Sequence, residues 1–356
     1  MPIPISQKID LIKKRIGFNT MRRLLGHSCG ITAIGNDLFV NRFENEVKSN
    51  TSISIAVDKF WSDLLFGGKS RLSSVYQYEN SNFLDELRNK LILLKPDKKN
   101  SFVKSFPYPA NKNELEKQTN EQHFCSLDSY KYKDKDLYVA TFCSRAIYMS
   151  TNDVDPSFLS DTGKNLKKDT EAQFYYRKKD VVQCYNVVIL DYSKNSIILS
   201  ADMSTLPKTE SSLQIDRLKT KIKSIGVNLS QPSNQLSSIE PLYKNNDGRI
   251  SAISFMTSDG NNSDFKLKPS QDCLRNDLYH KSGEDAVAKL AKYRLGKIWD
   301  VSLPKELKNS IELSLVGKRT MLDTGEPLSQ VITSNSTSLE HTLFLLDKLY
   351  EAGNTI

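Results

Sequence analysis

The chain has 356 residues, of which 38% are hydrophobic, and its 15 Phe and 15 Tyr supply enough apolar material to exclude global disorder. This length favours two domains over one small core. The formal net charge of +8 favours acidic partners, nucleic acid first, and the alternative is that the charge is spread over a solvated surface.

The cellular setting follows from features that the sequence lacks. No stretch approaches the roughly 20 apolar residues of a membrane span, and no long apolar run follows the first charges, as a signal peptide requires. The 5 Cys are widely spaced and odd in number, which argues against a disulfide framework. Lys, Asn, Ser and Ile are abundant, as in genes from AT-rich DNA. We therefore expect a cytoplasmic protein from a mobile bacterial gene, such as a phage-defence gene.

The first predicted element is a basic amphipathic helix over Ile5–Leu25, bent at Gly17. Such a helix can lie on nucleic acid or on an anionic membrane. The alternative is a helix docked on its own domain with a solvated basic face. The cations that could reach a nucleic acid are Lys13, Lys14, Arg15, Arg22 and Arg23.

The pattern next predicts a buried strand over Thr51–Val57 and helices over Asp58–Phe66 and Asn82–Leu94. One or two strands follow within Asp136–Met149. A polar segment from Ser150 to Asp169 then suggests a domain boundary. The N-terminal domain is therefore expected to span residues 1–155.

The rest of the chain, residues 170–356, is expected to form a second domain. Its clearest features are two hairpins with turn residues between alternating strands, and three helices with an apolar stripe. The hairpins are predicted over 181–201 and 249–268, and the helices over 211–225, 284–299 and 338–352. A strand is predicted over Ile311–Val316. The expected fold is mixed α+β, with two domains that each pack helices on a small, mostly antiparallel or mixed sheet.

Two further segments gather positive charge. The aromatic trio Phe174–Tyr176 is flanked by cations, and this combination can grip phosphates and stack bases. The alternative places the trio in a strand and the cations at its solvated ends. The predicted helix 211–225 turns a second set of cations outward. The candidate nucleic-acid-binding residues of these segments are Lys167, Lys168, Arg177, Lys178, Lys179, Arg217, Lys219, Lys221 and Lys223.

The segment Arg275–His280 carries the candidate catalytic pair, Arg275 and His280. The pattern of Arg, a polar residue, three others and His resembles the catalytic motif of HEPN-type ribonucleases. The resemblance implies that His280 acts as an acid or base on a ribose hydroxyl and that Arg275 stabilises the phosphate. In the alternative reading, Arg275 pairs with Asp272 or Asp277 and His280 caps a loop.

A metal-dependent nuclease is a further alternative. Asp259, Asp264 and Lys266 lie on the predicted hairpin much as an acid and an acid-x-Lys pair do in restriction-type nucleases, where carboxylates hold a cation. We predict no metal site and no cofactor. The preferred function is nucleic-acid binding or complex assembly, with a protein partner or a second copy as the other class of partner, and a metal-independent ribonuclease is the first alternative.

Overall fold

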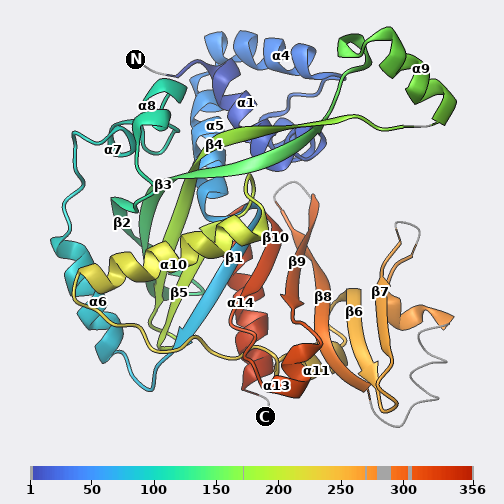
Figure 1. Ribbon diagram of the computed structural model, residues 1–356. Coiled ribbons are helices and arrows are strands. Elements are labelled where there is room, and N and C mark those ends of the chain that lie inside the picture. Colours follow the sequence, from blue (N-terminus) through green and yellow to red (C-terminus); the bar gives the residue numbers. More distant parts are fainter. Residues whose placement is uncertain (1–2, 171, 269–270, 279–289, 304–306, 355–356) are drawn as a thin grey trace.

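The computed structural model describes residues 3–170, 172–268, 271–278, 290–303 and 307–354. The described strands form one antiparallel sheet of 10 strands in the order β2-β3-β4-β5-β1-β10-β9-β8-β6-β7 (Figure 1). The strands are β1 Gly68–Gln77, β2 His123–Tyr132, β3 Lys135–Asp153, β4 Tyr175–Asp191, β5 Ser196–Asp202, β6 Arg249–Thr257, β7 Asn262–Lys266, β8 Leu290–Ser302, β9 Lys308–Val316 and β10 Val331–Ser336.

This single sheet shows that the expectation of two small-sheet domains is wrong. The strand responsible is β1, which pairs with β5 on one side and with β10 on the other. Leu72 lies between Ala201 and Ile332 in this register. The N-terminal part of the chain therefore supplies a central strand that joins the later strands into one sheet. The segment from Ser150 to Asp169, expected as a domain boundary, connects the paired strands β3 and β4.

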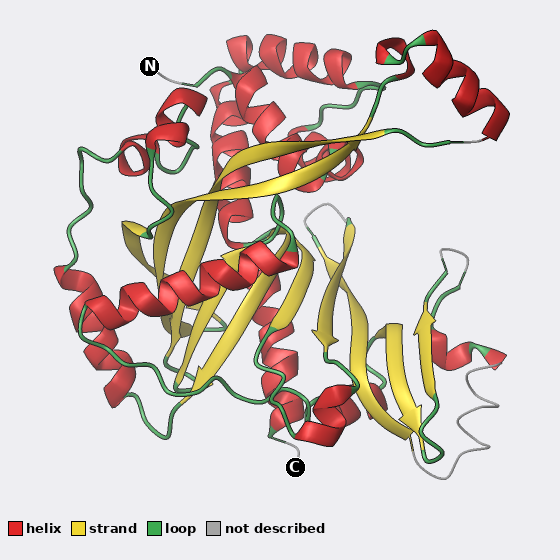
Figure 2. Cartoon of the chain, viewed as in Figure 1, coloured by secondary structure: helices red, strands yellow, loops and turns green. Residues whose placement is uncertain are grey.

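Helices surround the sheet, mostly on the side of β1 to β5 (Figure 2). They are α1 Ile5–Ile16, α2 Phe18–Met21, α3 His27–Cys29, α4 Asn36–Ser49, α5 Thr51–Phe66, α6 Asn82–Leu93, α7 Ser101–Ser105, α8 Lys112–Lys117, α9 Asp161–Thr170, α10 Lys208–Ser224, α11 Ile239–Lys244, α13 Thr320–Thr324 and α14 Leu339–Gly353. A π-helical turn, Arg22–Gly26, follows α2, and 3-10 turns cover Pro156–Phe158 and Leu274–Asn276.

Two predicted elements have the wrong type. The strand expected over Thr51–Val57 is the first half of α5, which Asn50 caps by accepting a hydrogen bond from the backbone N–H of Ser52 at 3.0 Å. The helix expected over 284–299 is wrong from Leu290 onward, because β8 begins there. In β8, Leu295, Lys297 and Trp299 alternate inward, and this spacing overrides the helical one. Residues 284–289 lie outside the described residues.

Other elements agree with the predicted pattern. Strands β4 and β5 pair where the hairpin 181–201 was expected, and β6 and β7 pair within 249–268. Helices α10 and α14 match the helices expected over 211–225 and 338–352 to within a few residues. The first helix breaks at Gly17, where the backbone φ is 78°.

One half of the sheet, made of β2, β3, β4, β5 and β1, is covered on both faces, and we call it the covered half. Helices α6 and α10 pack on one face through Leu87, Leu91 and Leu218. The other face packs against α1, α4 and α5 near Tyr185, and against α14 near Val187. Every residue of β5 is consequently buried.

The other half, made of β10, β9, β8, β6 and β7, is the open half. One face packs on α11 and α14 through residues such as Leu313 and Leu315. Strand β9 alternates between buried and accessible residues, so its second face is accessible. The register runs from Leu72 through Ile332 to Ser314, which makes this accessible face the continuation of the face that α10 covers elsewhere. Among the described helices, none lies across it (Figure 2).

A buried ion pair fixes the N-terminal helices to the covered half. Arg15 of α1 lies 2.8 Å from Asp202 at the end of β5, and their side chains are 4% and 0% exposed. Nearby, the buried guanidinium of Arg71 donates to the backbone carbonyls of Leu65, Tyr185 and Ser200. Desolvation lowers the pKa of Arg71 to about 10, although the charge of Asp202 opposes this shift. These polar groups order the junction between α1 and the sheet.

Candidate functional site

The accessible face of the open half carries acidic groups that already have partners. Asp300 lies 2.9 Å from Arg249 and accepts a hydrogen bond from Ser310 at 2.6 Å. Glu312 accepts hydrogen bonds from Ser251 and Ser314. The hydrogen bond from Ser310, together with the charge of Arg249, lowers the pKa of Asp300. These two carboxylates are therefore bonded within the sheet.

Four cations lie at one end of this face, and we call them the cation cluster: Lys208, Arg294, Lys318 and Arg319. Arg294 stands opposite Val316 in the pairing of β8 with β9, and Lys318 and Arg319 follow the end of β9. Lys208 is the first residue of α10, which lies on the same face of the sheet. Lys208, Lys318 and Arg319 are exposed, and Arg294 is half-buried.

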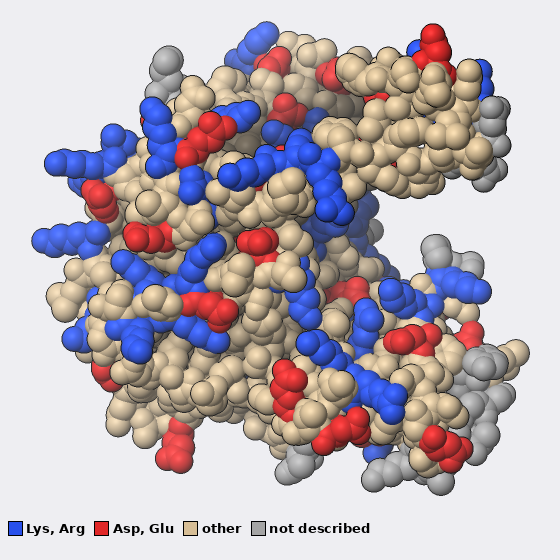
Figure 3. Space-filling view, viewed as in Figure 1, with Lys and Arg blue, Asp and Glu red and all other residues tan. Residues whose placement is uncertain are grey.

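The electrostatics place the members of the cation cluster near one another. Partial desolvation, and then the charges of Lys318 and Arg294, lower the pKa of Lys208. Burial and then the charge of Asp264 raise the pKa of Tyr293, while Arg294 and Arg319 both act to lower it. Within the described part of the chain, no Asp or Glu forms an ion pair with any of the four. Like charges thus lie near one another on an accessible surface, and Figure 3 shows Lys and Arg over β8 and β9 with Asp and Glu among them.

The cations expected on the first helix have different positions. Lys13 pairs with Asp10 at 3.0 Å, Lys14 is exposed, and Arg15 is buried against Asp202. Arg22 and Arg23 are exposed and line a cavity of about 820 Å³ beside the start of β9. The structure therefore divides this group between the core, a solvated helix face and the wall of a cavity.

The cations expected around the aromatic trio lie on a projection that we call the arm, residues 149–179. It consists of the ends of β3 and β4, the turn Pro156–Phe158 and α9, and it extends beyond the rest of the sheet (Figure 1). All five predicted cations of this segment are exposed: Lys167, Lys168, Arg177, Lys178 and Lys179. Lys178 pairs with Asp180 at 3.3 Å. Residues 149–179 contain 6 Lys and Arg and 5 Asp and Glu, so the arm has a formal net charge of only +1.

The cations on α10 line its solvent-facing side. Lys219 lies 3.5 Å from Asp216, and Lys223 is exposed. Arg217 and Lys221 line a cavity of about 630 Å³ together with Gln122 and Thr220. This surface lies along α10, whose first residue belongs to the cation cluster.

The guanidinium of Arg275 binds the backbone. It donates to the carbonyls of Tyr243, Asn245 and Gly248, and it lies 5.7 Å from the centre of the Tyr243 ring. These contacts order the segment between α11 and β6. His280 lies outside the described residues, so the structure provides no distance between the two members of the predicted pair.

The two carboxylates predicted to bind a metal, Asp259 and Asp264, occupy different structural positions. Asp264 of β7 accepts a hydrogen bond from Ser254, its neighbour on β6, and Asp259 belongs to the turn between these strands. Within the described ranges, no group of three or more His, Cys, Asp or Glu is placed to hold a metal ion.

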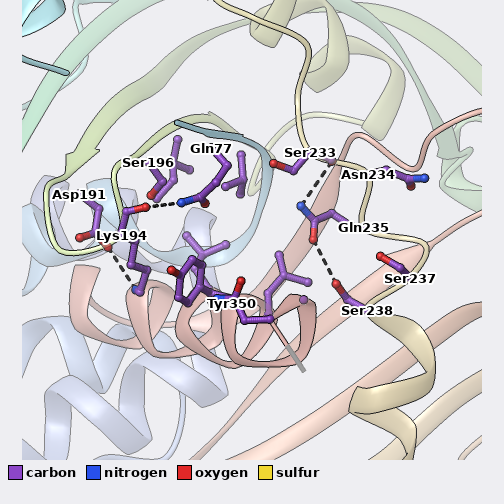
Figure 4. Close-up of a pocket in the computed structure, with 16 residues that line it drawn as sticks. Gln77, Asp191, Lys194, Ser196, Ser233, Asn234, Gln235, Ser237, Ser238 and Tyr350 are labelled. Carbon is purple, nitrogen blue, oxygen red and sulfur yellow. Dashed lines mark hydrogen bonds and ion pairs between the residues drawn. The ribbon is translucent and has the colours of Figure 1, made fainter. Parts of the chain in front are cut away.

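A further cavity, of about 170 Å³, lies between α14 and the segment 233–238 (Figure 4). Its polar residues bond one another: Gln77 donates to the carbonyl of Lys194, and Gln235 bonds Ser233 and Ser238. Lys194 pairs with Asp191 at 3.1 Å and also with Asp347 of α14. The lining therefore serves to join α14 to the covered half.

No protein-family model matches the chain, and no curated protein sequence matches it. Among the described helices, none has both the length and the apolar character needed to cross a membrane.

The cation cluster was not predicted from the sequence. Its members come from three segments, around residues 208, 294 and 318, that only the pairing of β8 with β9 and the position of α10 bring together. The adjacent pair Lys318-Arg319 was the one local signal, and it is too common in a basic chain to single out a site.

Proposed function

We propose that the protein binds nucleic acid through its phosphate backbone, at the cation cluster on the accessible face of the open half. The observation that supports this proposal is that Lys208, Arg294, Lys318 and Arg319 share one surface without an ion-paired carboxylate among the described residues. Bringing like charges together raises the free energy of the folded chain, and a bound polyanion offsets this cost.

The shape of the surface favours a polymer over a small anion. The cluster lies at one end of the exposed sheet face, beyond Ser314 on β9, and an extended backbone can pass over this end. Arginine also forms paired hydrogen bonds with phosphate oxygens, and Arg294 and Arg319 supply two guanidinium groups. Phosphate contacts of this kind bind DNA and RNA alike and carry little sequence preference.

The test is a fluorescence-anisotropy titration with labelled duplex DNA, single-stranded DNA and RNA at low salt. We expect binding by the wild-type chain and a large loss in the double variant Arg294→Glu/Lys318→Glu. The matched control is Lys112→Glu/Lys244→Glu, which changes the net charge equally at lysines that already face Glu116 and Glu240. Equal losses in both variants, or no binding by the wild type, would contradict the proposal.

A further inference from the structure

The tip of the arm is acidic and carries an exposed aromatic residue. Between residues 150 and 163 the sequence contains Asp153, Asp155 and Asp161 and no Lys or Arg, although Asp161 lies 3.7 Å from Lys164 of α9. Phe158 is 84% exposed at the end of a 3-10 turn. Asp155 caps this turn by accepting hydrogen bonds from the N–H and hydroxyl of Ser157 at 2.8 and 2.7 Å. The turn therefore presents Phe158 in a defined position, which lowers the entropy cost of docking it.

The cavity beside the start of β9 has the opposite character, and we call it the corner. Arg22, Arg23 and Arg42 line it, together with Ile34 and Leu38, which are 86% and 60% exposed. Arg23 donates to the carbonyl of Lys308 and to the side-chain oxygen of Asn309, and Arg42 donates to the carbonyl of Thr32. In the described part of the chain, none of the three arginines pairs with a carboxylate. The corner thus combines an apolar wall with arginines that form no ion pair with the carboxylates that the structure describes.

The tip and the corner match in both charge and polarity. A buried aromatic anchor with charged neighbours of the right sign is the usual centre of a protein interface. The exposure of Phe158, Ile34 and Leu38 shows that the tip does not fill the corner of its own chain. Because every copy carries both surfaces, a second copy of this chain is the occupant with the required chemistry.

We propose that the arm tip of one copy docks in the corner of a second copy. Phe158 packs against Ile34 and Leu38 of the other copy, and the acidic side chains of the tip pair with Arg22 and Arg42. Reciprocal exchange of two arms closes a twofold dimer, whereas one-way exchange builds a chain of copies. This contact uses none of the cation cluster, so it stands or fails independently of nucleic-acid binding.

The first test measures the mass of the full chain by light scattering after size exclusion, over a range of concentrations. We expect the wild type to self-associate and Phe158→Asp to raise the dissociation constant by about 30-fold or more, as for the loss of a central interface anchor. The matched control is Leu93→Asp, which places the same charge at another exposed apolar residue, at the end of α6. A monomeric wild type, or equal effects of both substitutions, would overturn the proposal.

The decisive test exchanges the charges of the tip and the corner. The tip variant is Asp153→Lys/Asp161→Lys, which leaves the Asp155 cap in place, and the corner variant is Arg22→Glu/Arg42→Glu. Each variant alone should be monomeric, and an equimolar mixture should associate again, because each repulsive contact then has an attractive alternative. Circular dichroism and thermal melting verify that both variants are folded. A mixture of folded variants that stays monomeric would refute the contact.

Discussion

The covered and open halves of the sheet are both antiparallel, but they differ in how many of their faces are buried. In the covered half, β5 is buried along its whole length between α10 and α14. In the open half, β9 buries every second residue and leaves the others accessible. The same face thus changes, within one continuous sheet, from a hydrophobic core to a polar surface. The first half is therefore buried on both faces, whereas the second leaves one face accessible.

The two halves also treat charge differently. In the covered half, Arg15 and Asp202 are both buried and oppositely charged. At the edge of the open half, the four cations of the cluster are accessible and have no ion-paired carboxylate within the described ranges. Removing a partner in the first case leaves a buried charge in the protein interior. Removing a cation in the second case relieves repulsion and should cost little stability.

The largest expected effect is therefore that of Asp202→Ala, which leaves the Arg15 guanidinium buried without its counter-ion. We expect a loss of about 4 kcal/mol in the free energy of unfolding, measured by urea denaturation. The control is Asp300→Ala, which breaks the partly exposed pair with Arg249 and should cost about 1 kcal/mol or less. Similar losses for the two variants would remove the distinction between the halves.

The next largest effect is the difference in stability between substitutions on the two faces of β9. Leu313→Ala removes a fully buried side chain that packs in the core with α14, and it should cost about 3 kcal/mol. The adjacent Ser314→Ala changes the accessible face and should alter the free energy of unfolding by about 0.5 kcal/mol or less. The measurement is again urea denaturation. If Ser314→Ala were as costly as Leu313→Ala, the second face would not be open.

A smaller effect concerns acid stability of the open half. Burial acts to raise the pKa of Asp247, but hydrogen bonds from Lys297 and Lys348 outweigh it and bring the pKa down to about 2. The ionised Asp247 and its two lysine partners therefore stabilise the fold above pH about 4. This contribution is lost as the pH falls through about 2 and Asp247 is protonated.

We expect this contribution to be about 1 kcal/mol after solvent screening. Unfolding titrations between these pH values should show a steeper loss of stability in the wild type than in Asp247→Asn. Parallel curves would contradict the assigned charge pair.

The sequence predicts those elements whose local pattern and tertiary environment agree. The hairpin of β4 and β5 and the helix α10 have clear periodicity, and both occur where expected. The alternating β-branched residues Ile53, Ile55 and Val57 favour a strand locally. The Asn50 cap and the inward spacing of Ile53, Val57 and Trp61 nevertheless produce a helix. Strand β1 went unrecognised because its inward residues include Arg71 and Ser73, which find partners only in the assembled sheet.

The candidate site shows the same limit. Clusters of cations close in sequence identified surfaces such as the arm, where 5 Asp and Glu offset most of the 6 Lys and Arg. The cation cluster depends on distant segments, and Arg42 of the corner lies on α4, apart from Arg22 and Arg23. A sequence lists the charges, whereas the fold decides which of them lack a counter-ion.

The most direct test of the proposed function is the salt dependence of duplex DNA binding. If four phosphates are neutralised, the logarithm of the association constant should fall against the logarithm of salt concentration with a slope of about −4. The slope should shrink to about −2 in Arg294→Ala/Lys318→Ala and remain near the wild-type value in Lys112→Ala/Lys244→Ala. An unchanged slope in the first variant would show that the accessible face of the open half does not hold the phosphate backbone.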